Sequence, residues 1–264
     1  MEVSKNKKYF ISDIHLGLPP AEDSLKREKL LVKWLDEIKD HAEELYLLGD
    51  IFDFWHEYKH VVPKGFVRFL GKLSELTDNG TKLYFFSGNH DIWAYNYFRT
   101  ELGAEIHHKP LVGEFNGARY FLAHGDGLGP GDPGYKLLKS IFRNRISQFL
   151  FARLHPNFAL WLGKTWSKNS RYAKGIVAKE FAGEEKEQQL IFAKRMLKKE
   201  HFDVFIFGHR HIPFDIQISE KSRVINLGDW IYSFTYGILD NNRFELLPYQ
   251  GNGENIIRKK FENN

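Results

Sequence analysis

Short apolar segments alternate with helical patterns over the first third of the chain, and this alternation constrains the fold most. Strand-like segments lie at 8–12, 44–48 and 82–87, with helical patterns at about 24–39 and 67–76. Such alternation predicts an α/β layer fold. Each strand-like segment runs into polar residues, in SDIHLG, LGDIFDFW and SGNHD. Because sites in α/β sheets collect at the carboxyl ends of strands, we expect these loops to share one rim.

The rest of the chain mixes further strands and helices. A short helix is predicted at about 93–102, and Asn116-Gly117 predicts a hairpin because this pair tolerates positive φ. A helix at about 184–199 precedes the strand-like DVFIFGHRH. Further antiparallel strands are predicted in FDIQIS, SRVINLGDW, SFTYGILD and RFELLPY. The final IIRKKFENN is predicted to be a loose tail.

The segment 136–166 is both apolar and basic, and no carboxylate occurs between Asp132 and Glu180. Two or more helices are predicted here, broken at Pro156, because proline disfavours helix in the residue before it. A basic amphipathic segment suits a membrane surface, a nucleic acid or a catalytic site. It does not suit a membrane span, because basic residues interrupt it, namely Arg143, Arg145, Arg153 and Lys164.

Composition narrows the class of protein. A chain of 264 residues fits one domain with an insertion or two small domains, and we expect one domain over residues 1–264. The net charge of +4 is too small for a general polyanion binder. The absence of cysteine excludes disulfides, zinc ribbons and thiol catalysis. The polar start MEVSKNKKYFISD lacks the apolar stretch of a secretory signal, so a cytoplasmic protein is expected.

Five clusters of potential metal ligands follow strand-like segments. One cluster alone is weak evidence, since such pairs occur by chance, but five at strand ends indicate a metal site. Imidazole, carboxylate and amide ligands suit Mn, Fe or Zn better than Mg or Ca. This set supplies enough ligands for two metal ions only if one carboxylate binds both of them. In chain order the clusters are Asp13 and His15; Asp50 and Asp53; Asn89, His90 and Asp91; His124; His209 and His211.

The order DxH, GDxxD, GNHD, H and GHxH resembles the calcineurin-like metallophosphoesterase family, from Asp13 to His211. The resemblance implies a two-sheet β-sandwich flanked by helices and two divalent metal ions, with Mn²⁺ expected and Fe or Zn as alternatives. By motif position, one ion takes Asp13, His15 and His211; the other takes Asn89, His124 and His209, with Asp50 between them. Two such cations lower the pKa of a bridging water and neutralise phosphoryl oxygens.

The same resemblance assigns catalytic roles to His90 and Asp53. His90 corresponds to the family's acid or transition-state stabiliser, and Asp53 to the carboxylate that orients it. A structural turn is the alternative role for Asp53. Histidines outside the motifs are expected on the surface or in packing, among them His56, His60, His107, His108, His155 and His201.

Additional motifs are similar to one branch of the family, the UDP-2,3-diacylglucosamine pyrophosphatases of lipid A biosynthesis. They are SDIHLG, LGDIFDFW, SGNHDIW, AHGDGLGPGDPGYK, WSKNSR, GHRHIP and NLGDW. The branch implies a helical lid at about 128–180 that takes up two acyl chains. It also implies substrate contacts by Asn89, His90, Asp132, Ser170, Lys174 and His209. The chain departs from the branch in RYAKGIVAKE and at His90, where some members have arginine.

The lid residues suit such a substrate. The apolar side chains would pack against the acyl chains, and the basic side chains would bind the diphosphate. The apolar set is Leu137, Leu138, Ile141, Phe142, Ile146, Phe149, Leu150 and Leu154, and the basic set is Lys136, Lys139, Arg143, Arg145 and Arg153. Packing on the domain is the alternative for each apolar residue, as in any helix pair.

The resemblance therefore implies hydrolysis at the α-phosphorus of UDP-2,3-diacylglucosamine, giving UMP and 2,3-diacylglucosamine 1-phosphate. The enzyme would lie on the cytoplasmic face of the inner membrane. Another phosphodiester, pyrophosphate or nucleic acid is the alternative substrate, but the mostly aliphatic lid favours acyl chains over stacked bases. A membrane-binding module with a decayed metal centre is disfavoured, because no ligand position is missing.

Overall fold

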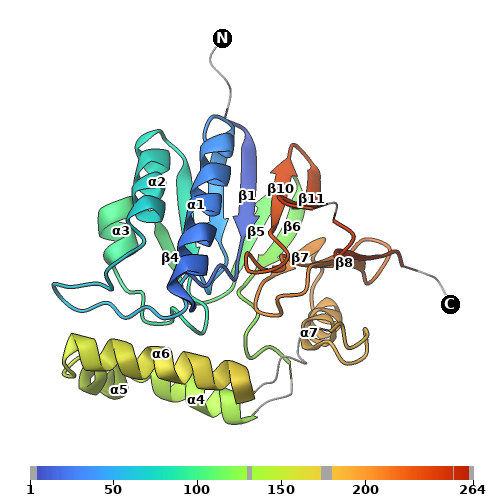
Figure 1. The fold of residues 1–264 in the computed structure, drawn as a ribbon. Coiled ribbons are helices and arrows are strands. Elements are labelled where there is room, and N and C mark those ends of the chain that lie inside the picture. The colour runs from blue at the N-terminus through green and yellow to red at the C-terminus, as the bar shows by residue number, and fades with distance from the viewer. Residues whose placement is uncertain (1–4, 130–132, 174–179, 252, 262–264) are drawn as a thin grey trace.

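The computed structural model describes residues 5–129, 133–173, 180–251 and 253–261, and the side chains of these residues except 169–173. Two six-stranded sheets form its centre (Figure 1). The first sheet has the order β11-β10-β1-β2-β3-β4, and β1 to β4 run parallel. Its strands are β1 (Lys7–Ile11), β2 (Ala42–Leu47), β3 (Lys82–Phe86), β4 (Glu105–His107), β10 (Thr235–Asp240) and β11 (Arg243–Pro248).

The second sheet has the order β12-β8-β9-β7-β6-β5, with β6, β7 and β9 parallel. The hairpin that joins β5 to β6 turns at Asn116 and Gly117, whose φ angles of 52° and 81° both lie in the left-handed region. The strands are β5 (Leu111–Phe115), β6 (Ala118–Leu122), β7 (Val204–Phe207), β8 (Phe214–Gln217), β9 (Arg223–Asn226) and β12 (Ile257–Lys259).

Alternate residues of each central strand enter different cores. Successive side chains of a strand point to opposite faces of its sheet. In β2, Tyr46 packs in the core between the two sheets, whereas Leu45 and Leu47 pack under the helices on the outer face. In β7, Ile206 lies between the sheets and Phe205 lies under a helix. Burial on both faces explains why these strands read as continuous apolar runs.

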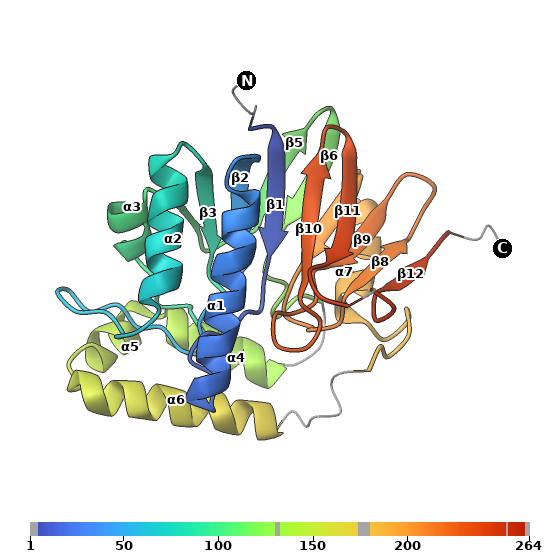
Figure 2. The ribbon, with the colours of Figure 1, turned by 45° about the horizontal axis from the view of Figure 1, so that its top comes forward.

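Helices cover both outer faces of the sandwich. The first sheet is covered by α1 (Ala21–Ile38), α2 (Val67–Asp78) and α3 (Tyr97–Leu102), and the second by α7 (Gln188–Leu197). Three further helices lie across the end of the sheets toward which β1 runs (Figures 1 and 2). These insertion helices are α4 (Pro133–Arg143), α5 (Arg145–Phe151) and α6 (Pro156–Ala173). Among the described residues, no helix has the length and apolarity to cross a membrane.

The predicted α/β two-sheet fold is confirmed, and so is the break of the insertion at Pro156. The predicted loose tail is wrong, because residues 257–259 pair parallel with β8. The helix predicted from Trp93 begins only at Tyr97, because the backbone of Trp93 instead forms a bridge with His56. The strand β9, predicted as antiparallel, pairs antiparallel with β8 but parallel with β7.

Candidate metal centre

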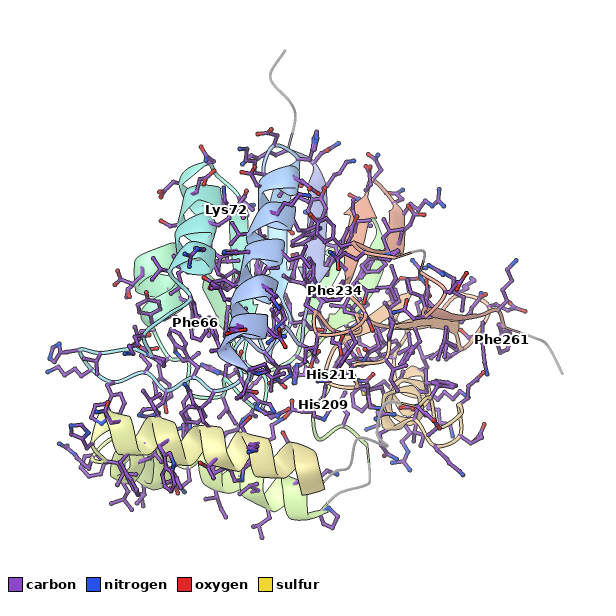
Figure 3. The ribbon with its side chains drawn as sticks, in the orientation of Figure 1. Phe66, Lys72, His209, His211, Phe234 and Phe261 are labelled. Atoms are coloured by element: carbon purple, nitrogen blue, oxygen red, sulfur yellow. The ribbon has the colours of Figure 1, made fainter. Side chains whose placement is uncertain are left out.

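All five predicted ligand clusters lie at carboxyl ends of strands, on the edge of the sandwich that faces the insertion helices. Asp13 and His15 follow β1, and Asp50 follows β2. The remaining clusters follow β3, β6 and β7. His209 and His211 lie between the sheets and α6 (Figure 3). The parallel strands of both sheets thus bring residues that are far apart in sequence to one rim.

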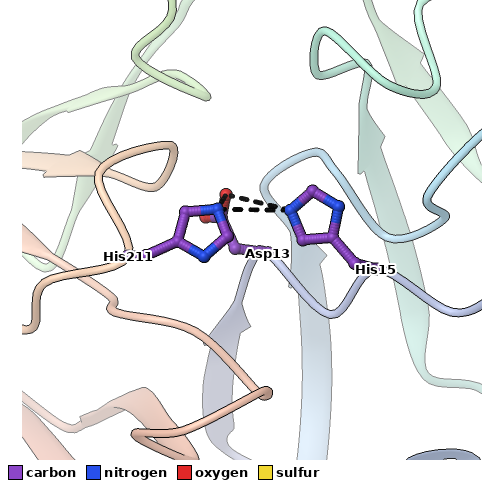
Figure 4. A group of neighbouring side chains, drawn as sticks. All are labelled: Asp13, His15 and His211. Atoms are coloured by element: carbon purple, nitrogen blue, oxygen red, sulfur yellow. Dashed lines mark hydrogen bonds and ion pairs between the residues drawn. The ribbon is translucent and has the colours of Figure 1, made fainter. Parts of the chain in front are cut away.

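Asp13, His15 and His211 form a first group of converging ligand atoms (Figure 4). The Nε2 atoms of the two imidazoles lie 3.2 Å apart, and Asp13 Oδ1 lies 3.3 Å from His211 Nε2. Asp13 Oδ1 is buried and has no hydrogen-bond partner among the described residues. A carboxylate oxygen and two imidazole nitrogens therefore point at a common position.

A second group contains Asp50, His124 and His209, whose ligand atoms also converge. Asp50 Oδ2 lies 3.3 Å from His124 Nε2 and 3.7 Å from His15 Nε2. Asn89 Oδ1 lies 3.3 Å from His124 Nε2. Asp50 therefore stands between the first group and the second, where a bridging carboxylate would stand.

Neighbouring acceptors orient two of the imidazoles. His124 Nδ1 donates to the carbonyl oxygen of Leu48 at 2.8 Å, and this acceptor fixes the proton on Nδ1. His211 Nδ1 donates to Asp229 Oδ2 at 3.1 Å. In both residues Nδ1 is engaged by an acceptor and Nε2 faces the cluster, as in histidines that bind metals. Asp229 follows β9 in the sequence LGD, the same pattern as LGD at Asp50, and this repetition is the sequence signal for its role.

The backbone is strained at the centre. Non-glycine residues rarely adopt positive φ, and such residues concentrate at functional sites. Gly208 lets the chain pass close to a ligand, since a Cβ there would lie 2.4 Å from Asp13 Oδ2. Five of the predicted ligands have φ between 49° and 69°: Asp13, His15, Asp50, His209 and His211.

Asp91 joins two of the ligand loops. Its carboxylate is fully buried and accepts hydrogen bonds from the backbone N–H groups of Gly88 at 2.6 Å and Ile51 at 2.8 Å. Burial and the Asp50 charge raise the pKa of Asp91 to about 7. The position of Asp50 relative to Asn89 is thus fixed by the last residue of the GNHD motif.

Burial and neighbouring charges have opposite effects on the pKa values of several proposed metal-binding residues. Burial lowers the pKa of His15 to about 4, so its imidazole is neutral at neutral pH. Burial also disfavours a charged His124, but Asp50, Asp13 and Asp126 together outweigh it and raise the pKa of His124 to about 10. Burial disfavours ionisation of Asp50, yet the nearby His124 and His90 hold its pKa well below the usual range. A cation that binds here must therefore displace the proton of His124.

His90 and Asp53 lie beside the first group. His90 Nδ1 is 2.8 Å from the backbone carbonyl oxygen of Asp53, and the Asp53 carboxylate is 3.6 Å from His15 Nδ1. Both side chains are buried. The backbone N–H of His90 donates to Asp50 Oδ1 at 2.8 Å, which ties His90 to the central carboxylate.

The insertion helices dock on these loops through an apolar cluster. Phe54, Ile92 and Trp93 form its buried part, and Phe142 packs against them. The Trp93 indole donates to the Phe142 carbonyl oxygen at 2.9 Å. Lys139 forms an ion pair with Asp126, in the loop after His124. The pocket that remains beside Asn89 has a volume of about 10 Å³, space for about one water molecule.

Three predicted substrate contacts fall outside this description. Asp132 and Lys174 lie outside the described residues, as does the side chain of Ser170. Among the six histidines named as surface or packing residues, His56 is buried and His107 is half-buried. The other four are exposed, namely His60, His108, His155 and His201.

The donor set fits divalent metal ions. It offers imidazole, carboxylate and amide groups, whose preferred partners are first-row transition ions. The family model of calcineurin-like phosphoesterases matches residues 7–213, which contain both ligand groups. The chain belongs to the calcineurin-like phosphoesterase family. This metallophosphoesterase family uses two divalent metal ions, and the ligand atoms of this chain converge in the first and second groups and in a third, His15 with Asp53 and His90, which shares His15 with the first.

Curated relatives of this phosphoesterase match it over nearly their whole length. A UDP-2,3-diacylglucosamine hydrolase of Porphyromonas gingivalis is 37% identical over 254 residues, which cover 92% of this chain and 97% of the relative. A UDP-2,3-diacylglucosamine hydrolase of Ectopseudomonas mendocina is 28% identical, covering 91% and 97%. Among solved structures, a phosphoesterase from E. coli is 19% identical, with a TM-score of 0.45 and 92% of each chain covered.

Proposed function

We propose that this phosphoesterase cleaves the pyrophosphate bond of UDP-2,3-diacylglucosamine, giving UMP and 2,3-diacylglucosamine 1-phosphate. One arrangement carries the proposal: basic helices with exposed apolar side chains lie across the end of the sheets that carries the ligand groups (Figure 1). The hydrolase name of the relative that is 37% identical supports the same substrate. The proposal places one metallophosphoesterase domain over residues 1–264, with a lid at about 128–180.

We assign one divalent ion to Asp13, His15 and His211, and a second to Asn89, His124 and His209, with Asp50 shared. The convergence of the ligand atoms and the orientation of two imidazoles by Leu48 and Asp229 support this assignment. Manganese is the proposed metal, and the same donors also suit iron or zinc. When bound, the two ions would activate a water molecule and neutralise phosphoryl oxygens.

The chain's own residues would bind and orient the diphosphate. Asn89 and His90 follow β3 and His209 follows β7, and all three are proposed to contact the phosphoryl groups. His90 is the proposed acid or transition-state stabiliser, because its Nδ1 is held by a backbone carbonyl and its Nε2 is left for substrate. Asp53 is the proposed orienting residue. Asp132, Ser170 and Lys174 remain proposed contacts for the UDP-glucosamine part.

The insertion helices are proposed to act as the lid for the acyl chains. Large apolar side chains on them are exposed in an unusually dense set: Leu137, Ile141, Ile146, Phe149, Leu150, Phe158, Trp161 and Leu162. Exposed apolar surface of this extent is typical of a lipid or partner site. The pocket beneath them beside Asn89 holds about one water molecule, so the proposal has the helices move when an acyl chain enters there.

The same surface is proposed to rest on the cytoplasmic face of the inner membrane. The segment 133–179 contains basic residues and no carboxylate, and anionic lipid attracts such a segment. The exposed aromatic rings of Phe149 and Trp161 suit the interfacial region of a bilayer. A peripheral position would let the lid take its lipid substrate directly from the bilayer.

An activity assay with purified protein and Mn²⁺ tests which substrate is cleaved. The protein is offered the lipid-linked UDP-sugar, an aryl phosphodiester and single-stranded DNA, and product release is followed for each. The proposal expects UMP from the UDP-sugar at a kcat/KM well above that for the other two substrates. Brisk cleavage of DNA without release of UMP would overturn it in favour of a nuclease.

A further inference from the structure

Ser167 of α6 reaches the proposed catalytic pair from the insertion. Its side chain is fully buried. Ser167 Oγ lies 3.2 Å from Asp53 Oδ1 and 3.0 Å from His90 Nδ1. A hydroxyl of the insertion helices therefore contacts both residues that the proposed reaction uses for proton handling and orientation.

The hydrogen-bond pattern fixes the imidazole of His90 in one state. The backbone carbonyl of Asp53 can only accept, so Nδ1 of His90 carries a proton and donates it to this oxygen, and Nε2 is the nitrogen not engaged by Asp53. The Ser167 hydroxyl donates to Asp53 Oδ1. Its oxygen can then accept a share of the Nδ1–H bond. The three groups form a closed network around one side of the ring.

Small residues bring α6 close enough for this contact. Ala159, Gly163 and Ser167 are spaced by four and are all buried, so they share one face of the helix. At Gly163 an added Cβ would lie 2.2 Å from a ring carbon of Phe54. A larger residue there would have to displace either the Phe54 ring or α6.

The position of Ser167 also depends on the docking of the other insertion helices. The neighbouring Trp166 packs edge-on against Phe142 of α4, with ring centroids 4.9 Å apart. The Trp166 ring lies 6.5 Å from that of His90. Phe142 is in turn held by the Trp93 indole. Movement of the helices as one unit would therefore remove the hydroxyl from His90.

We propose that Ser167 is a positioning residue that orients His90 only when the insertion helices are docked. Its hydroxyl holds the Nδ1 side of the ring together with Asp53, so that Nε2 points at the substrate. Lid closure and alignment of the catalytic imidazole thus become one event. The inference rests on the proposed hydrolysis, in which His90 acts on the phosphoryl group.

A double-mutant cycle tests this role. Ser167→Ala is expected to lower kcat about tenfold with Mn²⁺ and the UDP-linked lipid, because it removes a buried hydrogen bond to the catalytic pair. KM and bound manganese should stay within about twofold of the wild-type values. In the His90→Gln background, the same Ser167→Ala change is expected to lower kcat by less than twofold, since it acts through His90.

A matched control removes another hydroxyl from the insertion. Ser140 is exposed on α4, and Ser140→Ala should leave kcat and KM unchanged. An equal tenfold loss in the wild-type and His90→Gln backgrounds would overturn the positioning role, as would a loss confined to KM. The same cycle is measured with an aryl phosphodiester. Failure to release UMP while this diester is hydrolysed would reject the proposed substrate and still allow the Ser167 cycle to be measured.

Discussion

The sandwich and the insertion helices use apolar residues in opposite ways. Every residue of β7 is buried, and alternate side chains fill the core between the sheets and the core under α7. The helices α4 and α5 contain no buried residue, although both are rich in Leu, Ile and Phe. Apolar residues in the sandwich therefore stabilise the fold, whereas many of those in the insertion remain available to a ligand or a membrane.

The sandwich and the insertion also differ in the charge of their side chains. Buried carboxylates line the rim of the sandwich, among them Asp13, Asp50 and Asp53. The insertion between residues 133 and 179 contains basic residues and no carboxylate. One region is built to hold cations, and the other attracts anions. A metal-dependent reaction on an anionic lipid would need both, and four experiments test this division.

The largest effect on activity is expected when a carboxylate on the rim of the sandwich is replaced. Asp50→Ala should lower kcat roughly a thousandfold or more, because it removes the carboxylate between the two ligand groups. Bound metal, measured by elemental analysis, should fall as well. Asp240→Ala is the control, since Asp240 forms a peripheral ion pair with Lys7. Metal content and kcat that survive the loss of Asp50 would contradict the shared-carboxylate assignment.

The next largest effect is expected when exposed apolar residues of the insertion are replaced. Replacing Phe149 and Leu150 together by serine should weaken binding to anionic vesicles about tenfold, because both side chains are more than half exposed. UMP release from vesicle-borne substrate should fall in parallel, while hydrolysis of a soluble aryl phosphodiester stays constant. Leu25→Ser, on α1, is the matched control. Unchanged vesicle binding by the double variant would contradict the membrane role of the exposed apolar residues in the insertion.

A smaller effect is expected from one basic residue of the insertion. Arg143→Ala should raise KM about fivefold at nearly constant kcat, since an exposed cation contributes about 1 kcal/mol or less to binding an anion. The exposed Arg195 of α7 provides the control, Arg195→Ala. An equal loss of kcat in Arg143→Ala and Asp50→Ala would argue against a binding role for the insertion.

His56 lies where the two regions meet, and its effect should appear only in stability. Its ring contacts Tyr58, Trp93 and Phe151, and neither ring nitrogen has a hydrogen-bond partner among the described residues. Burial lowers the pKa of His56 to about 4. Between pH 6.5 and 4 the unfolded chain takes up a proton that the folded chain does not, so the free energy of unfolding falls as the pH falls.

His56→Phe removes this titration and suits the aromatic surroundings. Between pH 7 and pH 4 its free energy of unfolding should fall by about 3 kcal/mol less than that of the wild type, as measured by urea denaturation. At pH 7 the activity should be unchanged. The exposed His60 gives the control His60→Phe, which should keep the pH dependence of the wild type. Parallel pH profiles for wild type and His56→Phe would show that this imidazole is not desolvated.

The sequence by itself determined the α/β class, the hairpin at Asn116 and Gly117, and the candidate ligands from Asp13 to His211. These features depend on local causes. Strand and helix periodicity, turn residues that accept positive φ, and ligands placed directly after strands can all be read within a short window. The family resemblance joined the separate motifs into one site before their distances were known.

Only the tertiary structure decided which distant groups support that site. Asp229 orients His211, Ser167 meets His90 across 77 residues, and residues 257–259 join β8 rather than forming a tail. Ser167 and the run 257–259 carry no sequence signal of such roles, and the LGD pattern of Asp229 does not name His211 as its partner, because the partners come from remote segments and are selected by packing. The burial of His56 in aromatic rings has the same origin. Local propensity set the elements, and long-range packing of the sandwich against the insertion set the environment of each side chain.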